Sequence, residues 1–101
     1  MLVAAEKMQA YTAGVTEAEF LASGLTADAV SLNLLVLGEE ANRLSEPTRA
    51  LDPLIPWRDL ISLRHRIAHG YARIDLRIVW RIVQDDLPPL AQRLARLPGM
   101  I

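Results

Sequence analysis

The spacing of apolar residues along the chain predicts a series of helices. The first helix is expected from Leu2 to Ala13, because Gly14 suits the position that follows a helix end. The segment Thr16-Glu17-Ala18-Glu19 has the sequence of a capping box, which predicts a short second helix as far as Ala22. Gly24 is expected to end that helix.

A long helix is predicted next, with Thr26 as its cap and its end near Ser45. Its apolar residues repeat at four- and three-residue steps and form one buried stripe: Val30, Leu34, Leu37, Ala41 and Leu44. Leu32, Leu35 and Val36 lie off that stripe, so the helix is apolar on more than one face. Such a helix either contacts a second subunit or lies fully inside one bundle, and the sequence alone leaves both alternatives open.

The second half of the chain begins with a connector, residues 46–52, which has room for one helical turn. Pro56 suits the first position of the next helix. That helix is expected to run to about His69, with Gly70 as the glycine that follows its end.

Asp75 is expected to cap the final helix, which Pro88-Pro89 should kink or restart. Four aliphatic residues are assigned to its inner face: Ile78 and Ile82, together with Val79 and Val83. No segment alternates with the two-residue period of a strand. The predicted fold class is therefore all-α, an antiparallel four- to five-helix bundle without a sheet, in a single domain over residues 1–101.

Composition adds constraints on assembly and location. Hydrophobic residues make up 51% of the 101 residues and the mean hydropathy is +0.18, which is high for a small soluble monomer and favours an extra buried face such as a homodimer interface. The absence of cysteine excludes disulfides, thiolate zinc sites and cysteine nucleophiles. Residues 1–10 do not read as a signal peptide and no apolar run is long enough to span a bilayer, so a cytoplasmic protein with no membrane partner is expected.

The formal charge of −1 hides an uneven distribution. Residues 1–56 carry three basic and eight acidic side chains, whereas residues 57–81 carry six arginines and two aspartates. A net charge near zero argues against a protein that coats nucleic acid, but the local arginine cluster permits a phosphate-binding site.

The segment that carries candidate chemistry is Arg64-His65-Arg66-Ile67-Ala68-His69-Gly70-Tyr71. His65 and His69 lie one helical turn apart on the same face, and Arg66 is also a neighbour of His69. Arg64 is about 140° around the helix from His69, a separation that a long arginine can bridge.

These groups suit cleavage of RNA without a metal ion, because RNA supplies its own nucleophile, the 2′-hydroxyl. A histidine can transfer the protons, and an arginine can hold the non-bridging phosphate oxygens. One histidine cannot easily serve as both acid and base, whereas two copies across a dimer axis could.

Other interpretations compete with this one. Spacing alone would also fit a solvated helix face. His65 and His69 have metal-ligand spacing, but no glutamate lies between them and the chain has no cysteine or third histidine, so no metal site is predicted. Tyr71 follows the predicted helix end and can fold back over His69, whereas taken alone it would be half-buried packing. We assign Trp57 and Trp80 to the core, and Arg77 and Arg81 to the surface.

The pattern Arg64-x4-His69-x-Tyr71 resembles the R-x4-H-x-Y motif of the HepT-like HEPN toxins, the partners of minimal nucleotidyltransferase (MNT) antitoxins. That family places a polar residue after the arginine, usually asparagine, and here the residue is His65. The resemblance covers nearly the whole chain through the segments Thr26 to Ala29, Asn33-Leu34, Gly38-Glu39 with Ala41, Ile55 to Asp59, Ile74-Asp75, Val79-Trp80 and Asp86 to Pro88.

The resemblance implies a helical-bundle homodimer in which the two motifs face each other across a cleft. It implies RNA cleavage by Arg64 and His69, with His65 and Arg66 in support and no cofactor. It further implies a toxin of a type VII toxin–antitoxin system, neutralised when the MNT antitoxin adds AMP to Tyr71, in a homodimer or a larger hetero-oligomer. The alternatives are a non-catalytic HEPN module that binds a nucleotide or a nucleotidyltransferase, and an inert bundle with an incidental motif.

Two features depart from the family's pattern. Leu32 and Leu35 stand where the family often has charged residues on either side of the asparagine–leucine pair, which changes contacts at the dimer or the cleft. The first helix also looks shortened at its beginning.

Overall fold

The computed structural model describes residues 1–98, and every regular element in that range is helical. The all-α prediction is therefore confirmed. In chain order the elements are α1 (Leu2–Thr12), α2 (Glu17–Ala22), α3 (Gly24–Arg43), α4 (Glu46–Arg49), α5 (Trp57–Gly70), a 3₁₀ turn (Tyr71–Arg73), α6 (Leu76–Arg81), a π-helical turn (Ile82–Asp86) and α7 (Leu87–Leu94).

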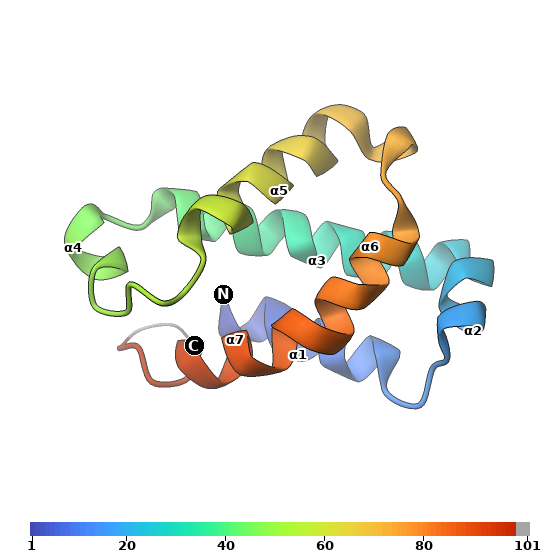
Figure 1. Cartoon of the computed structure of the whole chain (residues 1–101), viewed down its shortest axis with the longest axis horizontal. Coiled ribbons are helices and arrows are strands. Elements are labelled where there is room, and N and C mark those ends of the chain that lie inside the picture. Colours follow the sequence, from blue (N-terminus) through green and yellow to red (C-terminus); the bar gives the residue numbers. More distant parts are fainter. Residues whose placement is uncertain (99–101) are drawn as a thin grey trace.

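The long helix α3 runs through the middle of the molecule, with α5 crossing on one side and α1, α6 and α7 on the other (Figure 1). α3 packs against α5 and α1, while α1 also contacts α7, and α2 contacts both α3 and α6. The shortest extent is only 18 Å, about the thickness of two helices. Because so thin a chain cannot enclose α3, the alternative of a fully internal central helix is wrong, and Leu32 is 58% exposed.

The predicted stripe on α3 forms the centre of the core. Val30, Leu34, Leu37 and Ala41 are all buried, and Leu44 at the helix end packs partly against them. Phe20 of α2 is fully buried, and the centroid of its ring lies 5.1 Å from the ring centroid of Trp80. Most of the other buried apolar side chains come from α1, α5, α6, the π-helical turn and α7, and Ile55 joins them from the connector before α5, so one core joins all the long elements.

The boundary between α2 and α3 differs from the prediction. Thr16 forms the expected capping box with Glu19, but Ser23, not Thr26, caps α3 by accepting a hydrogen bond from the Thr26 amide at 3.2 Å. Gly24 accordingly begins α3 and does not terminate α2. A serine with extended backbone is as good a cap as a threonine, and Gly24 lacks the positive φ of Gly14, which is +73°.

The end of α5 also differs. Gly70 is the last residue of α5 with a φ of −158°, so it is not the left-handed residue that was expected there. The chain continues directly into the 3₁₀ turn Tyr71–Arg73. At the other end α5 begins at Trp57, one residue later than predicted, and Pro56 occupies the cap position. The connector contains the expected single turn, α4.

The last helix is interrupted before its proline pair. Asp75 caps α6 as predicted, by accepting a hydrogen bond from the Arg77 amide at 2.9 Å. Val79 and Val83 are buried, but Ile78 is 41% exposed, so its assignment to the inner face is wrong. The break predicted at Pro88-Pro89 takes the form of the π-helical turn just before them. The α-helical hydrogen-bond pattern is already interrupted there, so the two amide donors that the prolines lack cost little stability.

Candidate functional site

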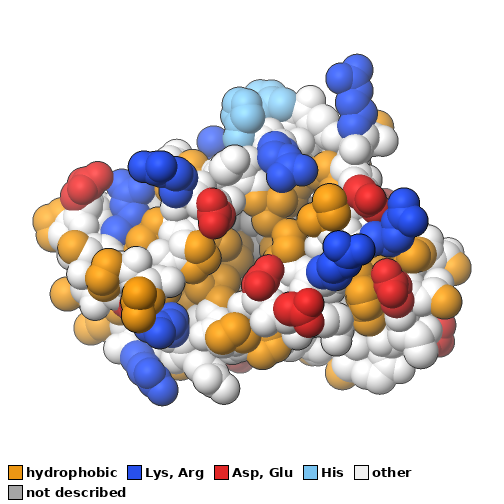
Figure 2. All heavy atoms as spheres, in the orientation of Figure 1, with side chains coloured by type: hydrophobic (Ala, Val, Ile, Leu, Met, Phe, Trp, Pro, Cys, Tyr) orange, Lys and Arg blue, Asp and Glu red, His pale blue; other side chains and the backbone are white. Residues whose placement is uncertain are grey.

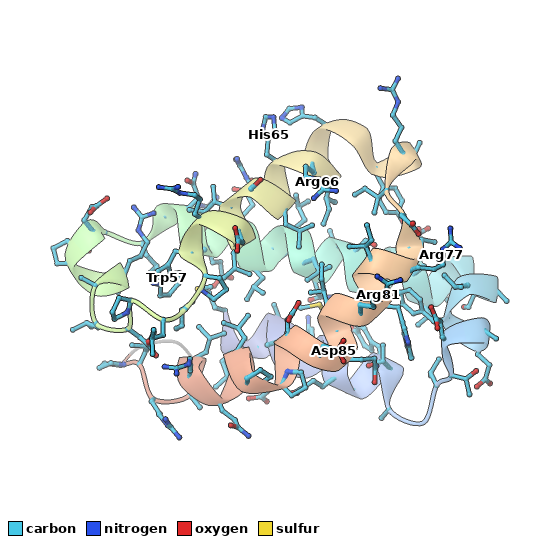
Figure 3. The ribbon with its side chains drawn as sticks, viewed as in Figure 1. Trp57, His65, Arg66, Arg77, Arg81 and Asp85 are labelled. Carbon is cyan, nitrogen blue, oxygen red and sulfur yellow. The ribbon has the colours of Figure 1, made fainter. Side chains whose placement is uncertain are left out.

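Helix α5 places the arginine and the histidines of the motif on different sides. Leu60 and Ile67 are the buried residues of α5 and define its inner face. Arg64 lies beside that face, toward α3, whereas His65 and His69 are exposed. Figure 3 shows His65 pointing out from α5 away from α3, and Arg66 leaving α5 on the side of α6.

The position of Arg64 is fixed by two residues of α3. Gly38 allows α5 to approach closely, since a Cβ at Gly38 would come within 2.6 Å of the Leu60 carbonyl oxygen and closer still to the Cβ of Arg64. Next to it, Glu39 accepts a hydrogen bond from Arg64 Nε at 2.6 Å. This charge-assisted bond orients the guanidinium, and its two outer nitrogens form no hydrogen bond with the described residues.

The two histidines form a pair on the outer face. Their ring centroids lie 4.5 Å apart with an interplanar angle of 49°. In Figure 2 they are the pale-blue group at the margin of the molecule, near Lys and Arg atoms. Their spacing along α5 thus brings two proton-transferring groups to one surface.

A shallow hollow of about 270 Å³ lies beside the pair, lined by His65, Arg66, His69, Gly70, Arg73 and Ile74. The structure therefore brings together His69 and both predicted supporting residues, His65 and Arg66. Arg64 does not line this hollow, so within one chain Arg64 and His69 do not share a pocket. The expectation that Arg64 reaches across α5 to His69 is thus not met within one chain, where Arg64 is bonded to Glu39, and only a second copy could bring an Arg64 to His69.

Arg73 is the residue of this hollow that the sequence analysis missed. The sequence did not link Arg73 to the histidines, because the 3₁₀ turn after Gly70 was not predicted. Arg73 is four residues after His69, as His69 is after His65, and the 3₁₀ turn that follows Gly70 brings Arg73 to the same hollow. That spacing was the available signal.

Tyr71 lies on the other side of the turn. Its hydroxyl donates a hydrogen bond to Asp28 Oδ1 of α3, and the side chain does not line the hollow. The expectation that Tyr71 folds over His69 is therefore wrong. Partial burial, followed by the hydrogen bond to Asp28, raises the pKa of the Tyr71 hydroxyl above its usual value. The residue is 39% exposed, so a reagent or enzyme can reach its ring edge.

The remaining candidates take structural roles. Trp57 is half-buried and its indole donates to the carbonyl oxygens of Arg49 and Asp52, both at 3.0 Å. Trp80 packs on Phe20, as expected of a core residue. Arg77 is a surface residue paired with Asp75 at 3.3 Å.

A second and larger hollow, of about 540 Å³, separates α5 from α7 and adjoins the first hollow at Arg66. Leu34 and Leu37 of α3 contribute to its mainly aliphatic lining, and Asp59 and Asp86 also line it. Figure 2 shows this region as an apolar surface flanked by acidic side chains. Its chemistry therefore differs from that of the histidine hollow, which no carboxylate lines.

The described residues were also searched for a metal-binding cluster and for a membrane-spanning helix. No group of three or more histidine, cysteine, aspartate or glutamate side chains within residues 1–98 is arranged to hold a metal ion. Nor does any helix in that range combine the length and apolar character needed to cross a bilayer.

Comparison with known proteins gives consistent matches. Residues 1–97 match the protein family described as Ribonuclease HepT-like. The chain is 30% identical over 94 residues to a Thermococcus cleftensis protein named "Probable ribonuclease HepT", which covers 93% of this chain and 86% of that protein. It is 27% identical over 94 residues to a Methanocaldococcus jannaschii protein named as a "Putative RNase", again covering 93% of this chain and 86% of that one. No solved structure gives a significant match.

Proposed function

This chain belongs to the HepT-like ribonuclease family, and on that premise we propose that it is an endoribonuclease that needs no metal ion. The observation that carries the proposal is the exposed His65–His69 pair beside a hollow lined by arginines. The names of its relatives support the same reaction class.

In the proposed reaction the 2′-hydroxyl of RNA attacks the neighbouring phosphorus, and the bond to the 5′-oxygen breaks. His69 of one copy accepts the proton of the 2′-hydroxyl, and the equivalent histidine of the other copy donates a proton to the leaving oxygen. Arg64, oriented by Glu39, neutralises the charge that builds up on the non-bridging oxygens. His65 and Arg66 support His69 and contact the substrate.

A homodimer is part of the proposal because Arg64 and His69 face different sides of α5. A two-fold axis near α5 would set Arg64 of one copy opposite His69 of the other. Exposed apolar side chains provide contact area for such an interface: Leu32 is 58% exposed and Leu54 is 72% exposed. The aliphatic hollow between α5 and α7 adds further apolar surface.

We further propose that the protein is the toxin of a type VII pair, inactivated by a cognate MNT antitoxin. The antitoxin would transfer AMP from ATP to the Tyr71 oxygen with release of pyrophosphate. Tyr71 follows His69 by two residues but is bonded to Asp28, so an added nucleotide would break that hydrogen bond and add anionic phosphate at the end of the motif, where it would repel RNA. Co-expression with an MNT protein should add about 329 Da per AMP unit, and a Tyr71→Phe variant should gain nothing.

The test of the ribonuclease proposal is incubation of the purified protein with total RNA in EDTA. We expect cleavage by the unmodified protein and by Arg77→Ala, and loss of cleavage in His69→Ala and Arg64→Ala. Cleavage that survives both of the last two substitutions would identify a contaminating nuclease. Tight binding of an MNT protein without cleavage would instead support a non-catalytic binding module.

A further inference from the structure

The basic side chains of the hollow form a row that continues past the motif. His65, His69 and Arg73 follow one another at four-residue steps, and Arg66 lies alongside them. We propose that Arg73, together with Arg66, binds a phosphate of single-stranded RNA adjacent to the one that is cleaved. This inference rests on the proposed ribonuclease function and assigns the path of the substrate strand across one protomer.

The first support is the absence of a competing carboxylate. Arg64, Arg77 and Arg93 are held by Glu39, Asp75 and Asp52 respectively. Arg66 and Arg73 form no ion pair within residues 1–98, and both are exposed. An arginine without an internal partner keeps its full charge and all its donors for an external anion, and its planar fork fits two phosphate oxygens.

The second support is the size and setting of the hollow. A volume of about 270 Å³ is roughly nine times the share of one water molecule in the liquid, which is ample for a phosphate group. Imidazole and guanidinium groups line it and no acid does. Such a surface attracts the RNA backbone independently of base sequence.

The third support is the contrast with the larger hollow beyond Arg66. Asp59 and Asp86 line that space among aliphatic side chains. Two arginines line it as well, but Arg66 also borders the histidine hollow and Arg93 is paired with Asp52, so a phosphate backbone would meet two carboxylates there that have no ion-pair partner in the described residues. A strand bound at His65 and His69 therefore leaves more favourably past Arg73 and the 3₁₀ turn than along the gap between α5 and α7. Arg73 is thus assigned to binding and not to proton transfer.

The experiment measures binding of a fluorescent 2′-O-methyl oligonucleotide, which lacks the nucleophile and stays intact, by anisotropy at several salt concentrations. Arg73→Ala should bind about tenfold more weakly, and its plot of log affinity against log salt should be shallower by about one unit. Arg73→Lys should retain most of the slope. Arg77→Ala is the matched control, because it removes a nearby exposed arginine that is already paired with Asp75, and it should keep both the affinity and the slope.

Unchanged affinity and salt slope in Arg73→Ala would overturn the inference, and so would failure of the unmodified protein to bind the oligonucleotide. Cleavage of ordinary RNA is scored separately in the same preparations. Cleavage that persists while Arg73→Ala binds normally would leave the ribonuclease proposal standing and remove only the role of Arg73. Binding that depends on Arg73, without any cleavage, would support the role of Arg73 in binding RNA and contradict the ribonuclease proposal.

Discussion

Replacing Gly38 by alanine tests whether the close contact between α3 and α5 positions the motif. A Cβ at this position would lie 2.6 Å from the Leu60 carbonyl oxygen and 3.2 Å from the Cγ of Arg64. The Leu60 oxygen belongs to the helix backbone and cannot rotate away. Restoring an ordinary contact of 3.4 Å to this oxygen requires α5 to move by about 0.8 Å relative to α3, and the still closer Cβ of Arg64 requires at least as much.

The expected loss of stability follows from two opposing effects. Overpacking a well-packed contact typically costs about 1–3 kcal/mol, whereas alanine is better than glycine in a helix interior by about 1 kcal/mol. Because the clash is with the backbone, we expect an overpacking cost in the upper part of its range. After the gain from alanine is subtracted, the net destabilisation should be about 1–2 kcal/mol. For a chain of this size the melting temperature should fall by about 5–15 °C.

Thermal and urea unfolding followed by circular dichroism provide the measurement. Gly24→Ala is the matched control in the same helix, since nothing lies within 4 Å of its added Cβ. That variant should be neutral or slightly stabilising, because alanine reduces the entropy of the unfolded chain. A Gly38→Ala protein as stable as the unmodified protein would refute the argument, and an equal loss in Gly24→Ala would show that the close approach is not the cause.

The same substitution should reduce RNA cleavage more than the fraction of unfolded protein explains. Movement of α5 by a large part of an ångström shifts Arg64 against Glu39, and misplacement on this scale can lower a catalysed rate by about 100-fold. Cleavage is compared at a temperature where both variants are fully folded. A rate equal to that of the unmodified protein would separate the packing of Gly38 from the orientation of Arg64.

Three other outcomes test individual contacts. The pKa of Tyr71 should lie above the usual tyrosine range, seen as the step in 295 nm absorbance that Tyr71→Phe removes, and Asp28→Asn should lower that pKa. Because the folded pKa is raised, the contribution of Tyr71 to stability is present below about pH 10 and is lost as the pH rises through the folded value. Thr16→Ala should cost about 1 kcal/mol in urea unfolding, while Thr16→Ser should cost much less. Arg93→Ala should cost about 1 kcal/mol by removing the contact of Arg93 Nη1 with both Asp52 oxygens, and a double-mutant cycle with Asp52→Asn showing no coupling would contradict this.

Periodicity and capping residues predicted the helices because both signals are local. The four- and three-residue steps on α3 correctly identified its buried stripe, and Thr16 and Asp75 were correctly assigned as caps. Errors arose where two residues could serve the same local role. Ser23 and Thr26 are both capable caps, and only the packing of α2 against α3 and α6 selects the first.

The site was harder to predict because its partners come from distant segments. Nothing local to Arg64 indicates that Glu39 will hold it, and Tyr71 was expected beside His69 because the sequence does not reveal its bond to Asp28. The 3₁₀ turn after α5 was not predicted either, and Arg73 lies in that turn. Gly70 keeps a negative φ here, so the turn of the chain continues far enough to bring Arg73 to the histidine face.

One regularity connects these long-range contacts. Asp28 and Glu39 are eleven residues apart, which places them within about 20° of each other on one face of α3. Arg64 lies in α5, and Tyr71 begins the 3₁₀ turn directly after the last residue of that helix. Two acids on one face of α3 thus hold the two ends of the motif, Glu39 the arginine and Asp28 the tyrosine. The two histidines lie between these contacts in sequence and bond to no residue of α3 in the described chain, so their groups stay free for a ligand, while the second half of α5 is held to α3 at Arg64 and just beyond its end at Tyr71.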